Sequence, residues 1–230
     1  MTSQTITING PDGSFSGYLA KPASGTGPGI VVIQEIFGVN KVMRDTADWL
    51  AREGFVALCP DLFWRIEPGI DITDQSEAEW KKAFDLFGKF KADTGIIDIK
   101  ATIDTLRPLT NGKVGAVGYC LGGLMAYLTA CHTGSDASVG YYGVNIDTRL
   151  DEAKGIKAPL MLHIAGKDEF VSPEAQDKIV KGLHDNAHVT VHLYPEMDHA
   201  FARQGGAHYD KTQADEANAR TLAFFKRHLA

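Results

Sequence analysis

Short apolar runs of strand length alternate with segments of helical periodicity along most of this chain. Ile30–Ile33 is a continuous apolar run, which is typical of a strand covered on both faces in a parallel sheet. Val42–Arg52 and Ile96–Leu106 carry apolar residues at helical spacing. Such alternation indicates right-handed βαβ crossovers. The sequence therefore predicts an α/β fold with a mostly parallel central sheet, helices on both faces, and a single domain over residues 1–230.

Only the opening of the chain departs from this alternation. Thr5–Ile8 and Ser16–Leu19 flank the turn residues Asn9–Gly13, which predicts a hairpin. The other expected strands are Phe55–Leu58, Lys113–Gly118, Ser138–Tyr142, Leu160–Ala165 and Val189–Tyr194. The other expected helices are Ser76–Lys91, Leu121–His132, Pro173–Asn186 and Gln213–His228. Because sites in open α/β sheets form beyond the carboxyl ends of strands, we searched the loops after residues 33, 58, 118, 165 and 194.

Charge and hydropathy argue against nucleic acid and membrane as partners. The chain has 23 Lys+Arg against 29 Asp+Glu, a net charge of −6, without a basic run that would bind nucleic acid. No apolar stretch approaches the ~18 residues of a membrane span, and the N-terminus lacks the pattern of a signal peptide. We expect a cytoplasmic enzyme, a monomer or weak dimer, whose partner is a small molecule.

The cysteine pattern indicates neither a disulfide framework nor a metal site. The three cysteines are odd in number, and none belongs to a CxxC pair or a nearby CxxH spacing. The nucleotide-binding pattern GxGxxG is also absent. We therefore expect no cofactor and no metal, and we interpret Cys59 and Cys131 as core residues.

The most informative segment is Gly118–Gly122, which has the form G-x-nucleophile-x-G between an expected strand and an expected helix. A tight strand-to-helix turn of this kind, a nucleophile elbow, raises the side chain of its central residue above the sheet. Cys120 is that residue, and the helix N-terminus behind it favours the thiolate form. Cys120 is therefore the candidate nucleophile.

A cysteine nucleophile needs a base to accept its proton, and the base needs a carboxylate to orient it. Of eight histidines, His199 alone follows closely on the last strand, within Pro195–Phe201, and His208 further along falls on polar surface. Asp168 follows the strand Leu160–Ala165 at the same predicted edge, whereas Asp198 is adjacent to His199 and poorly placed to face it. We expect Asp168 to orient His199. The chain order nucleophile, acid, base is that of α/β-hydrolases.

Backbone N–H groups complete the predicted site. The residue after the nucleophile, Leu121, is expected to supply one donor of an oxyanion hole. The best candidate for the second donor is Ile36, in the loop after Ile30–Ile33. Glu35, in the same loop, is a carboxylate next to an apolar strand end, and we place it near the proposed thiol.

These motifs resemble the dienelactone hydrolase (carboxymethylenebutenolidase) family over nearly the whole chain. The matching segments are Gln-Glu-Ile-Phe-Gly at 34–38, Pro-Asp-Leu-Phe at 60–63 and Gly-Tyr-Cys-Leu-Gly-Gly at 118–123. The resemblance implies an α/β-hydrolase fold and a Cys120–His199–Asp168 triad. It implies opening of an enol lactone such as dienelactone to maleylacetate, within aromatic hydrocarbon catabolism, through an acyl-enzyme thioester. It also implies that Glu35 holds the resting thiol and that Arg203 binds the substrate carboxylate.

Two positions depart from the family pattern. Trp80 stands where the family enzyme has a second carboxylate-binding arginine, and Phe63 replaces a tyrosine. Candidates to replace that arginine are Lys81, Lys82 and Arg65, although lysine does not reproduce a bidentate arginine fork. With Arg203, the expected substrate-binding residues are Phe37, Phe63, Trp80 and Phe201, which suits a small anionic substrate.

Three other functions remain open at this point. The first is hydrolysis of a different small ester or lactone, given Trp80. The second is glutamine amidotransferase chemistry, which also uses an elbow cysteine; such enzymes place their acid two residues after the histidine, where this chain has Phe201. The third is a catalytically weak ligand-binding protein that keeps the elbow.

Overall fold

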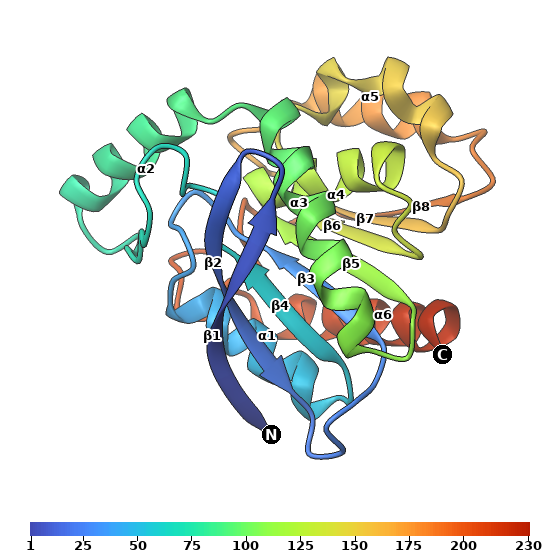
Figure 1. Ribbon diagram of the computed structural model, residues 1–230. Coiled ribbons are helices and arrows are strands. Elements are labelled where there is room, and N and C mark those ends of the chain that lie inside the picture. The colour runs from blue at the N-terminus through green and yellow to red at the C-terminus, as the bar shows by residue number, and fades with distance from the viewer. The chain divides into compact units, whose positions relative to one another are not determined.

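The computed structural model describes residues 1–230, which form two compact units, residues 1–116 and 117–230. Strand β5 (Val114–Tyr119) crosses from one unit into the other, and the strand order is β1-β2-β4-β3-β5-β6-β7-β8 (Figure 1). Most of the strand pairs described are parallel, and the β1–β2 and β2–β4 pairs are antiparallel. The predicted α/β class is confirmed, and the prediction of a single domain stays a prediction.

The strands of the first unit are β1 (Thr2–Gly10), β2 (Gly13–Lys21), β3 (Gly29–Ile33) and β4 (Val56–Pro60). The predicted hairpin forms, and it is longer than expected because β1 pairs with β2 from residue 2 to residue 21. All residues of β3 and β4 are buried, as the continuous apolar runs predict. Strand β4 runs through Pro60 rather than ending before it. Pro60 lies opposite Gly17 at the end of the strand, where a missing N–H is tolerated.

The helices of the first unit are α1 (Lys41–Arg52), α2 (Glu77–Lys89), α3 (Ala92–Leu106) and the short 3-10 helix η1 (Arg107–Leu109). Helices α1 and α3 lie on opposite faces of β3 and β4 (Figure 1). Ser76 caps the start of α2, since its Oγ accepts the Glu79 N–H at 3.3 Å. Helix α2 extends away from the strands, and only Ala83 and Leu86 on it are buried.

The strands of the second unit after β5 are β6 (Ser138–Tyr141), β7 (Leu160–Ala165) and β8 (Val189–Tyr194). Its helices are α4 (Leu121–His132), α5 (Pro173–Leu183), α6 (Lys211–Leu229) and the 3-10 helices η2 (Ile146–Thr148) and η3 (Leu150–Gly155). Helices α4 and α6 lie on opposite faces of these strands (Figure 1). Helix α5 ends at Leu183, three residues earlier than predicted, because Asn186 Oδ1 accepts the His188 N–H at 3.0 Å and forms a turn.

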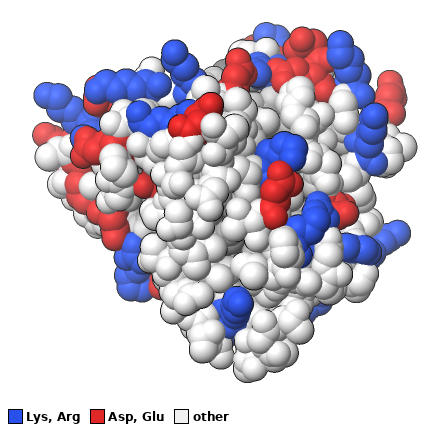
Figure 2. Space-filling model, viewed as in Figure 1, with Lys and Arg blue, Asp and Glu red and all other residues white.

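The surface carries interspersed charges. On the face drawn in Figure 2, Lys and Arg alternate with Asp and Glu, and no continuous basic patch is visible. None of the helices combines the length and the apolar composition that a membrane span requires.

Candidate active site

The turn between β5 and α4 holds Cys120 in a strained backbone conformation. Its φ of 56° and ψ of −115° are far from the values that non-glycine residues ordinarily adopt. Its N–H donates to the carbonyl oxygen of Tyr141 at 3.1 Å, which fixes the turn to the end of β6. Leu121 is the first residue of α4, so its N–H belongs to the helix N-terminus behind the thiol. The elbow predicted from the sequence is therefore present.

Glycines make this turn possible. A Cβ on Gly118 would lie 1.8 Å from the carbonyl oxygen of Gly122, and a Cβ on Gly123 would lie 2.5 Å from that of Tyr141. Both separations are far shorter than a van der Waals contact. The strand end and the first turn of the helix approach each other as closely as backbones can.

The loops after β7 and β8 are joined by backbone hydrogen bonds. Gly166 N–H donates to Tyr194 O at 2.8 Å, and Lys167 N–H donates to Met197 O at 2.9 Å. These two bonds follow directly on the parallel ladder, whose last pair is Ala165 with Tyr194. The residues that follow them, Asp168 and His199, are therefore held close together.

Asp168 and His199 form a buried hydrogen bond. His199 Nδ1 donates to Asp168 Oδ2 at 2.7 Å, with the two residues 7% and 5% exposed. The other carboxylate oxygen, Oδ1, accepts the Phe170 N–H at 2.8 Å, so the carboxylate cannot rotate freely. Asp198, adjacent in sequence, instead lies 3.4 Å from the ring of His208. The structure thus pairs the histidine with the carboxylate that the sequence analysis favoured.

The electrostatics of this pair depend on Cys120. Burial, the largest single effect, lowers the pKa of His199, and the negative charge of Cys120 is the largest of the effects that raise it. This charge and the hydrogen bonds of His199, including the one that it donates to Asp168, together outweigh burial and raise the pKa of His199 to about 10. Its remaining ring nitrogen, Nε2, is buried and makes no hydrogen bond of ordinary geometry. An imidazolium beside a thiolate is the arrangement that activates a cysteine nucleophile.

The other two cysteines have no such partner, as the sequence analysis expected. Burial raises the pKa of Cys131 to about 11 and raises the pKa of Cys59 still further above its ordinary value. Both side chains are buried and free. Their thiols stay protonated near neutral pH and do not act as nucleophiles.

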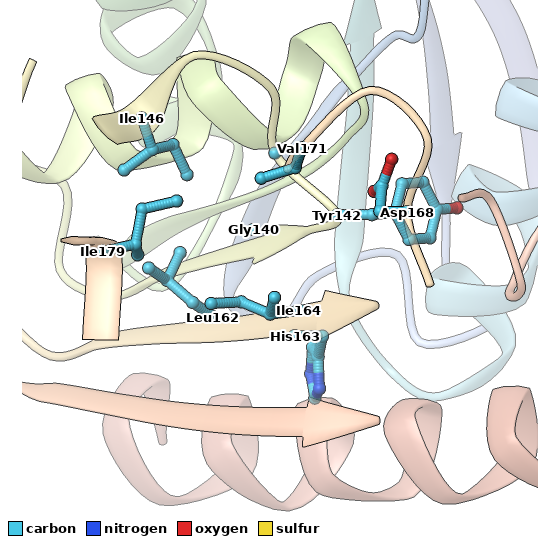
Figure 3. A pocket seen from close by; sticks show the side chains of 10 residues that line it. Gly140, Tyr142, Ile146, Leu162, His163, Ile164, Asp168, Val171 and Ile179 are labelled. Carbon is cyan, nitrogen blue, oxygen red and sulfur yellow. The ribbon is translucent and has the colours of Figure 1, made fainter. Parts of the chain in front are cut away.

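Two aromatic residues that the sequence analysis missed flank His199. The ring centroid of Tyr142 lies 5.1 Å from that of the imidazole, and the ring centroid of Phe170 lies 4.8 Å from it, both edge-on. Tyr142 has a φ of 37°, unusual for a residue other than glycine. It and Asp168 both line a small cavity of about 10 Å³ (Figure 3). The strand-end rule would have found Tyr142 had the loop after β6 been included in the search.

Arg203 and Phe201 follow His199 in a compact turn. Ala200 has a φ of 61°, and its carbonyl oxygen accepts the Arg203 N–H at 2.9 Å. Arg203 is 8% exposed. The ring of Phe201 is fully buried, 5.7 Å from Tyr142 and 4.8 Å from Tyr194 by ring centroids. Phe201 therefore supports the loop from within the core, and its expected contact with a substrate stays a prediction.

Several expected site residues lie in the first unit. Glu35, Ile36 and Phe37 follow β3 and are buried. Gln34 Oε1 accepts the Leu62 N–H at 3.0 Å, which ties this loop to the loop after β4. Phe63 in that second loop is fully buried. Because these residues belong to a different unit from Cys120, their approach to the thiol stays a prediction.

Trp80 belongs to an aromatic cluster in the first unit. Its ring packs edge-on against Phe37 at 5.1 Å and stacks on Phe84 at 5.5 Å, and its Nε1 donates to Asp74 O at 3.0 Å. This cluster gives α2 an apolar face where the resemblance implied a cationic one.

Two of the three candidates for the missing arginine already have ion-pair partners. Arg65 forms a two-pronged pair with the buried Asp98, through Nε at 2.9 Å and a terminal nitrogen at 2.7 Å. It also binds Asp12 at 2.8 Å. Lys82 pairs with Glu67. Lys81 is exposed on α2. The pair with buried Asp98 makes Arg65 a poor candidate for the carboxylate-binding role, whereas Lys82, in an exposed and therefore weak ion pair, stays a candidate with Lys81.

Comparison with known proteins decides the family. Residues 15–229 match the model of the dienelactone hydrolase family. The chain belongs to that family.

Relatives of similar length support this assignment. A "putative carboxymethylenebutenolidase" from Azospirillum brasilense is 49% identical over 222 residues, covering 96% of both chains. The carboxymethylenebutenolidase of Pseudomonas sp. (strain P51) is 39% identical over 230 residues, covering 99% of this chain and 96% of the other. A crystal structure from Klebsiella pneumoniae described as a "putative dienelactone hydrolase" has a TM-score of 0.85 at 27% identity, with 98% of each chain covered. The α/β-hydrolase fold and the assignment as a hydrolase are confirmed.

Proposed function

We propose that this member of the dienelactone hydrolase family opens a small lactone or ester through a thioester on Cys120. The observation that carries the proposal is the geometry at the elbow. A cysteine in a strained turn stands beside a buried histidine whose pKa is raised to about 10 and whose Nδ1 is held by Asp168.

The first half of the reaction forms the acyl-enzyme. The Cys120 thiolate attacks the ester carbonyl carbon, and the negative charge that develops on the carbonyl oxygen is stabilised by the N–H groups of Leu121 and Ile36. The carbon–oxygen bond of the ester then breaks, and the imidazolium of His199 gives its proton to the leaving oxygen. In an enol lactone the leaving group is a stabilised enolate, which a thiolate displaces readily.

The second half of the reaction regenerates the enzyme. Neutral His199 accepts a proton from a water molecule, which attacks the thioester carbonyl. The sulfur leaves as the thiolate, and the imidazolium forms again beside it. Asp168 holds the imidazole in the tautomer and orientation that both steps need.

The substrate class rests on the relatives and on five residues. Relatives at 39–40% identity are carboxymethylenebutenolidases, which favours an enol lactone such as dienelactone, opened to maleylacetate. In this proposal the guanidinium of Arg203 binds a substrate carboxylate, and Glu35 helps to activate the thiol. Phe37, Phe63 and Trp80 supply an apolar wall.

A second candidate substrate is an ester or lactone without a second carboxylate contact. The observation that favours it is Trp80 in an aromatic cluster where the resemblance implied an arginine, with Arg65 engaged elsewhere. Such a substrate would need only one anionic group, or none.

One experiment tests both candidates. Hydrolysis of cis- and trans-dienelactone and of p-nitrophenyl acetate is measured with the wild type and with Cys120→Ala. Loss of dienelactone turnover in the variant supports the enol-lactone assignment, and Cys120-dependent turnover of the neutral ester alone supports the second candidate. Full turnover of every ester by Cys120→Ala would refute the mechanism.

A further inference from the structure

A buried polar cluster joins three strands of the second unit to helix α6. Figure 3 shows the side chain of His163 pointing from β7 toward α6, away from the apolar residues that line the small cavity. His163 is 1% exposed, and both of its ring nitrogens have partners. The members of this cluster are Tyr141, His163, Tyr194, Asn218, Arg220 and Thr221.

The direction of these hydrogen bonds can be worked out from one end. Arg220 can only donate, and its terminal nitrogen lies 3.1 Å from Tyr194 Oη. Tyr194 Oη therefore accepts from Arg220, which leaves its own proton free for His163 Nδ1, at 2.9 Å. Nδ1 of His163 is then an acceptor.

The other end gives the same answer. Tyr141 Oη donates to Asn218 Oδ1 at 3.0 Å, so it accepts from Thr221 Oγ1 at 2.6 Å. Thr221 in turn accepts from His163 Nε2 at 3.0 Å. Nε2 of His163 carries the single proton of a neutral imidazole. Burial, with help from the charges of His192 and Arg220, holds the pKa of His163 well below its ordinary value, in agreement with that neutral state.

The resulting chain runs in one direction, from Arg220 through Tyr194, His163, Thr221 and Tyr141 to Asn218. Every internal member donates once and accepts once. Removing one hydroxyl therefore leaves a buried donor and a buried acceptor unpaired, which is costly in a core.

Two members of this chain also hold the backbone of the candidate active site. The carbonyl oxygen of Tyr194 accepts the N–H groups of Gly166 and Met197, which lie in the loops that carry Asp168 and His199. The Tyr194 ring packs on Phe201 at 4.8 Å, two residues after His199.

Near the other end of the hydrogen-bond chain, the carbonyl oxygen of Tyr141 accepts the Cys120 N–H at 3.1 Å. The hydrogen-bond chain therefore links the backbone segments that carry the proposed nucleophile Cys120, the acid Asp168 and the base His199.

We propose that the hydrogen-bond chain between Arg220 and Asn218 is a positioning network that sets the geometry of Cys120, Asp168 and His199. The inference rests on the triad proposed above. None of its members is proposed to contact substrate, so none of them is a catalytic residue. Their effect is exerted through the carbonyl groups of Tyr141 and Tyr194 and through the ring of Phe201.

The test is a matched pair at Thr221, which is fully buried in α6. Thr221→Val keeps the shape of the side chain and removes the hydroxyl, whereas Thr221→Ser keeps the hydroxyl. We expect Thr221→Val to lower kcat for p-nitrophenyl acetate about 10- to 100-fold with KM unchanged, and Thr221→Ser to retain kcat. Tyr194→Phe breaks the chain at another member and serves if Thr221→Val does not fold.

Tyr127→Phe is the control for a merely structural loss. Tyr127 is buried in the same unit, and its hydroxyl donates to Arg149 O at 3.0 Å, outside the chain. We expect this variant to lose stability and to keep its kcat. Equal losses of kcat in Tyr127→Phe and Thr221→Val, after matching for the fraction folded, would overturn the proposal.

Two measurements separate failure of the network from failure of the proposed reaction, since neither needs a substrate. The first is the rate of alkylation of Cys120 by iodoacetamide, with Cys120→Ala as the blank. The second is the pKa of His199 by NMR. We expect Thr221→Val to slow alkylation and to lower that pKa, with Thr221→Ser behaving as wild type. Unchanged values in both Thr221→Val and Tyr194→Phe would overturn the proposal, whatever the enzyme hydrolyses.

Discussion

The backbone carbonyl of Gly122 lies where the Cβ of any other residue at position 118 would be, only 1.8 Å away. The end of strand β5 and the first turn of helix α4 are therefore in direct backbone contact. This contact holds Cys120 at a φ of 56°, a conformation that the surrounding structure must stabilise. Glycine is required at position 118 for steric reasons, because a side chain there would collide with the backbone of α4 whether or not the thiol reacts.

Substitution of Gly118 by alanine should disrupt the elbow. We expect Gly118→Ala to lower the free energy of unfolding by about 3 kcal/mol or more, because either the strand or the helix must move. Gly88→Ala is the matched control, since its Cβ meets nothing within 4 Å in α2. That variant should gain about 0.5–1 kcal/mol from a better helix former. Urea unfolding of both variants measures the difference, and equal stability of Gly118→Ala and wild type would contradict the contact.

Replacement of Asp168 by asparagine should remove most of the activity without unfolding the protein. The amide cannot stabilise the charged ring or fix its tautomer, and the corresponding change in a serine protease lowers kcat about 10⁴-fold. We expect Asp168→Asn to lower kcat for p-nitrophenyl acetate about 10³-fold or more. Asp198→Asn, adjacent to His199 but next to His208, should retain kcat. A larger loss in Asp198→Asn would reverse the assignment of the acid.

Activity should fall at alkaline pH with a midpoint set by His199. The pKa of this residue is raised from 6.5 to about 10, so the imidazolium persists through neutral pH and loses its proton only as pH rises through about 10. Without that proton the leaving oxygen is not protonated, and kcat declines. The fall of kcat at alkaline pH is measured with a substrate that has a poor leaving group. A midpoint of this fall near pH 6.5 would contradict the raised pKa of His199.

The same pKa should depend on the thiol. Because the charge of Cys120 raises the pKa of His199 against the effect of burial, Cys120→Ala should move the titration of the imidazole to lower pH. NMR of the imidazole protons of His199 measures this titration directly. Cys131→Ala, in which a cysteine away from the elbow is changed, should leave the titration in place. An unchanged titration in Cys120→Ala would mean that the thiol and the ring do not interact.

Replacement by alanine should affect substrate binding at Arg203 and stability at Arg65. Arg203→Ala is expected to raise KM for an anionic lactone about 10-fold or more, with KM for a neutral ester unchanged, through loss of a charged hydrogen bond. Arg65→Ala leaves the Asp98 carboxylate buried without its cation, so it should cost about 3 kcal/mol of stability. Its KM for the anionic lactone should stay as in the wild type. An increase in that KM would restore Arg65 as a substrate-binding residue.

The features that could be predicted from the sequence are those fixed by near neighbours. The apolar run Ile30–Ile33 predicts a buried strand, and Ser76 with Glu79 predicts the start of a helix; both are confirmed. The boundaries of Leu121–His132 and Leu160–Ala165 match their elements. Helix α5 ended earlier than predicted because Asn186 forms a turn through its own side chain.

The candidate site was harder to predict where distant segments meet. Asp168 rather than Asp198 was a reasoned choice, but two backbone bonds between the loops at 166–167 and 194–197 are what bring Asp168 to His199. Tyr142, Phe170 and the chain through His163 carry no sequence motif. Phe170 and the hydrogen-bond chain through His163 were missed because their positions depend on the register of three parallel strands, whereas Tyr142 was missed because the loop after β6 was not among those considered.

The sequence by itself determined the alternation of strands and helices, the glycine-flanked elbow around Cys120 and the family resemblance. All three depend on residues only a few positions apart, whose backbone sterics and periodicity act locally. Only the tertiary structure brings Asp168 into its hydrogen bond with His199, Asp98 into its ion pair with Arg65, and both ring nitrogens of His163 within reach of their partners. The physical reason is that hydrogen bonds and ion pairs between segments tens of residues apart depend on strand register and burial, which appear only when the chain has folded.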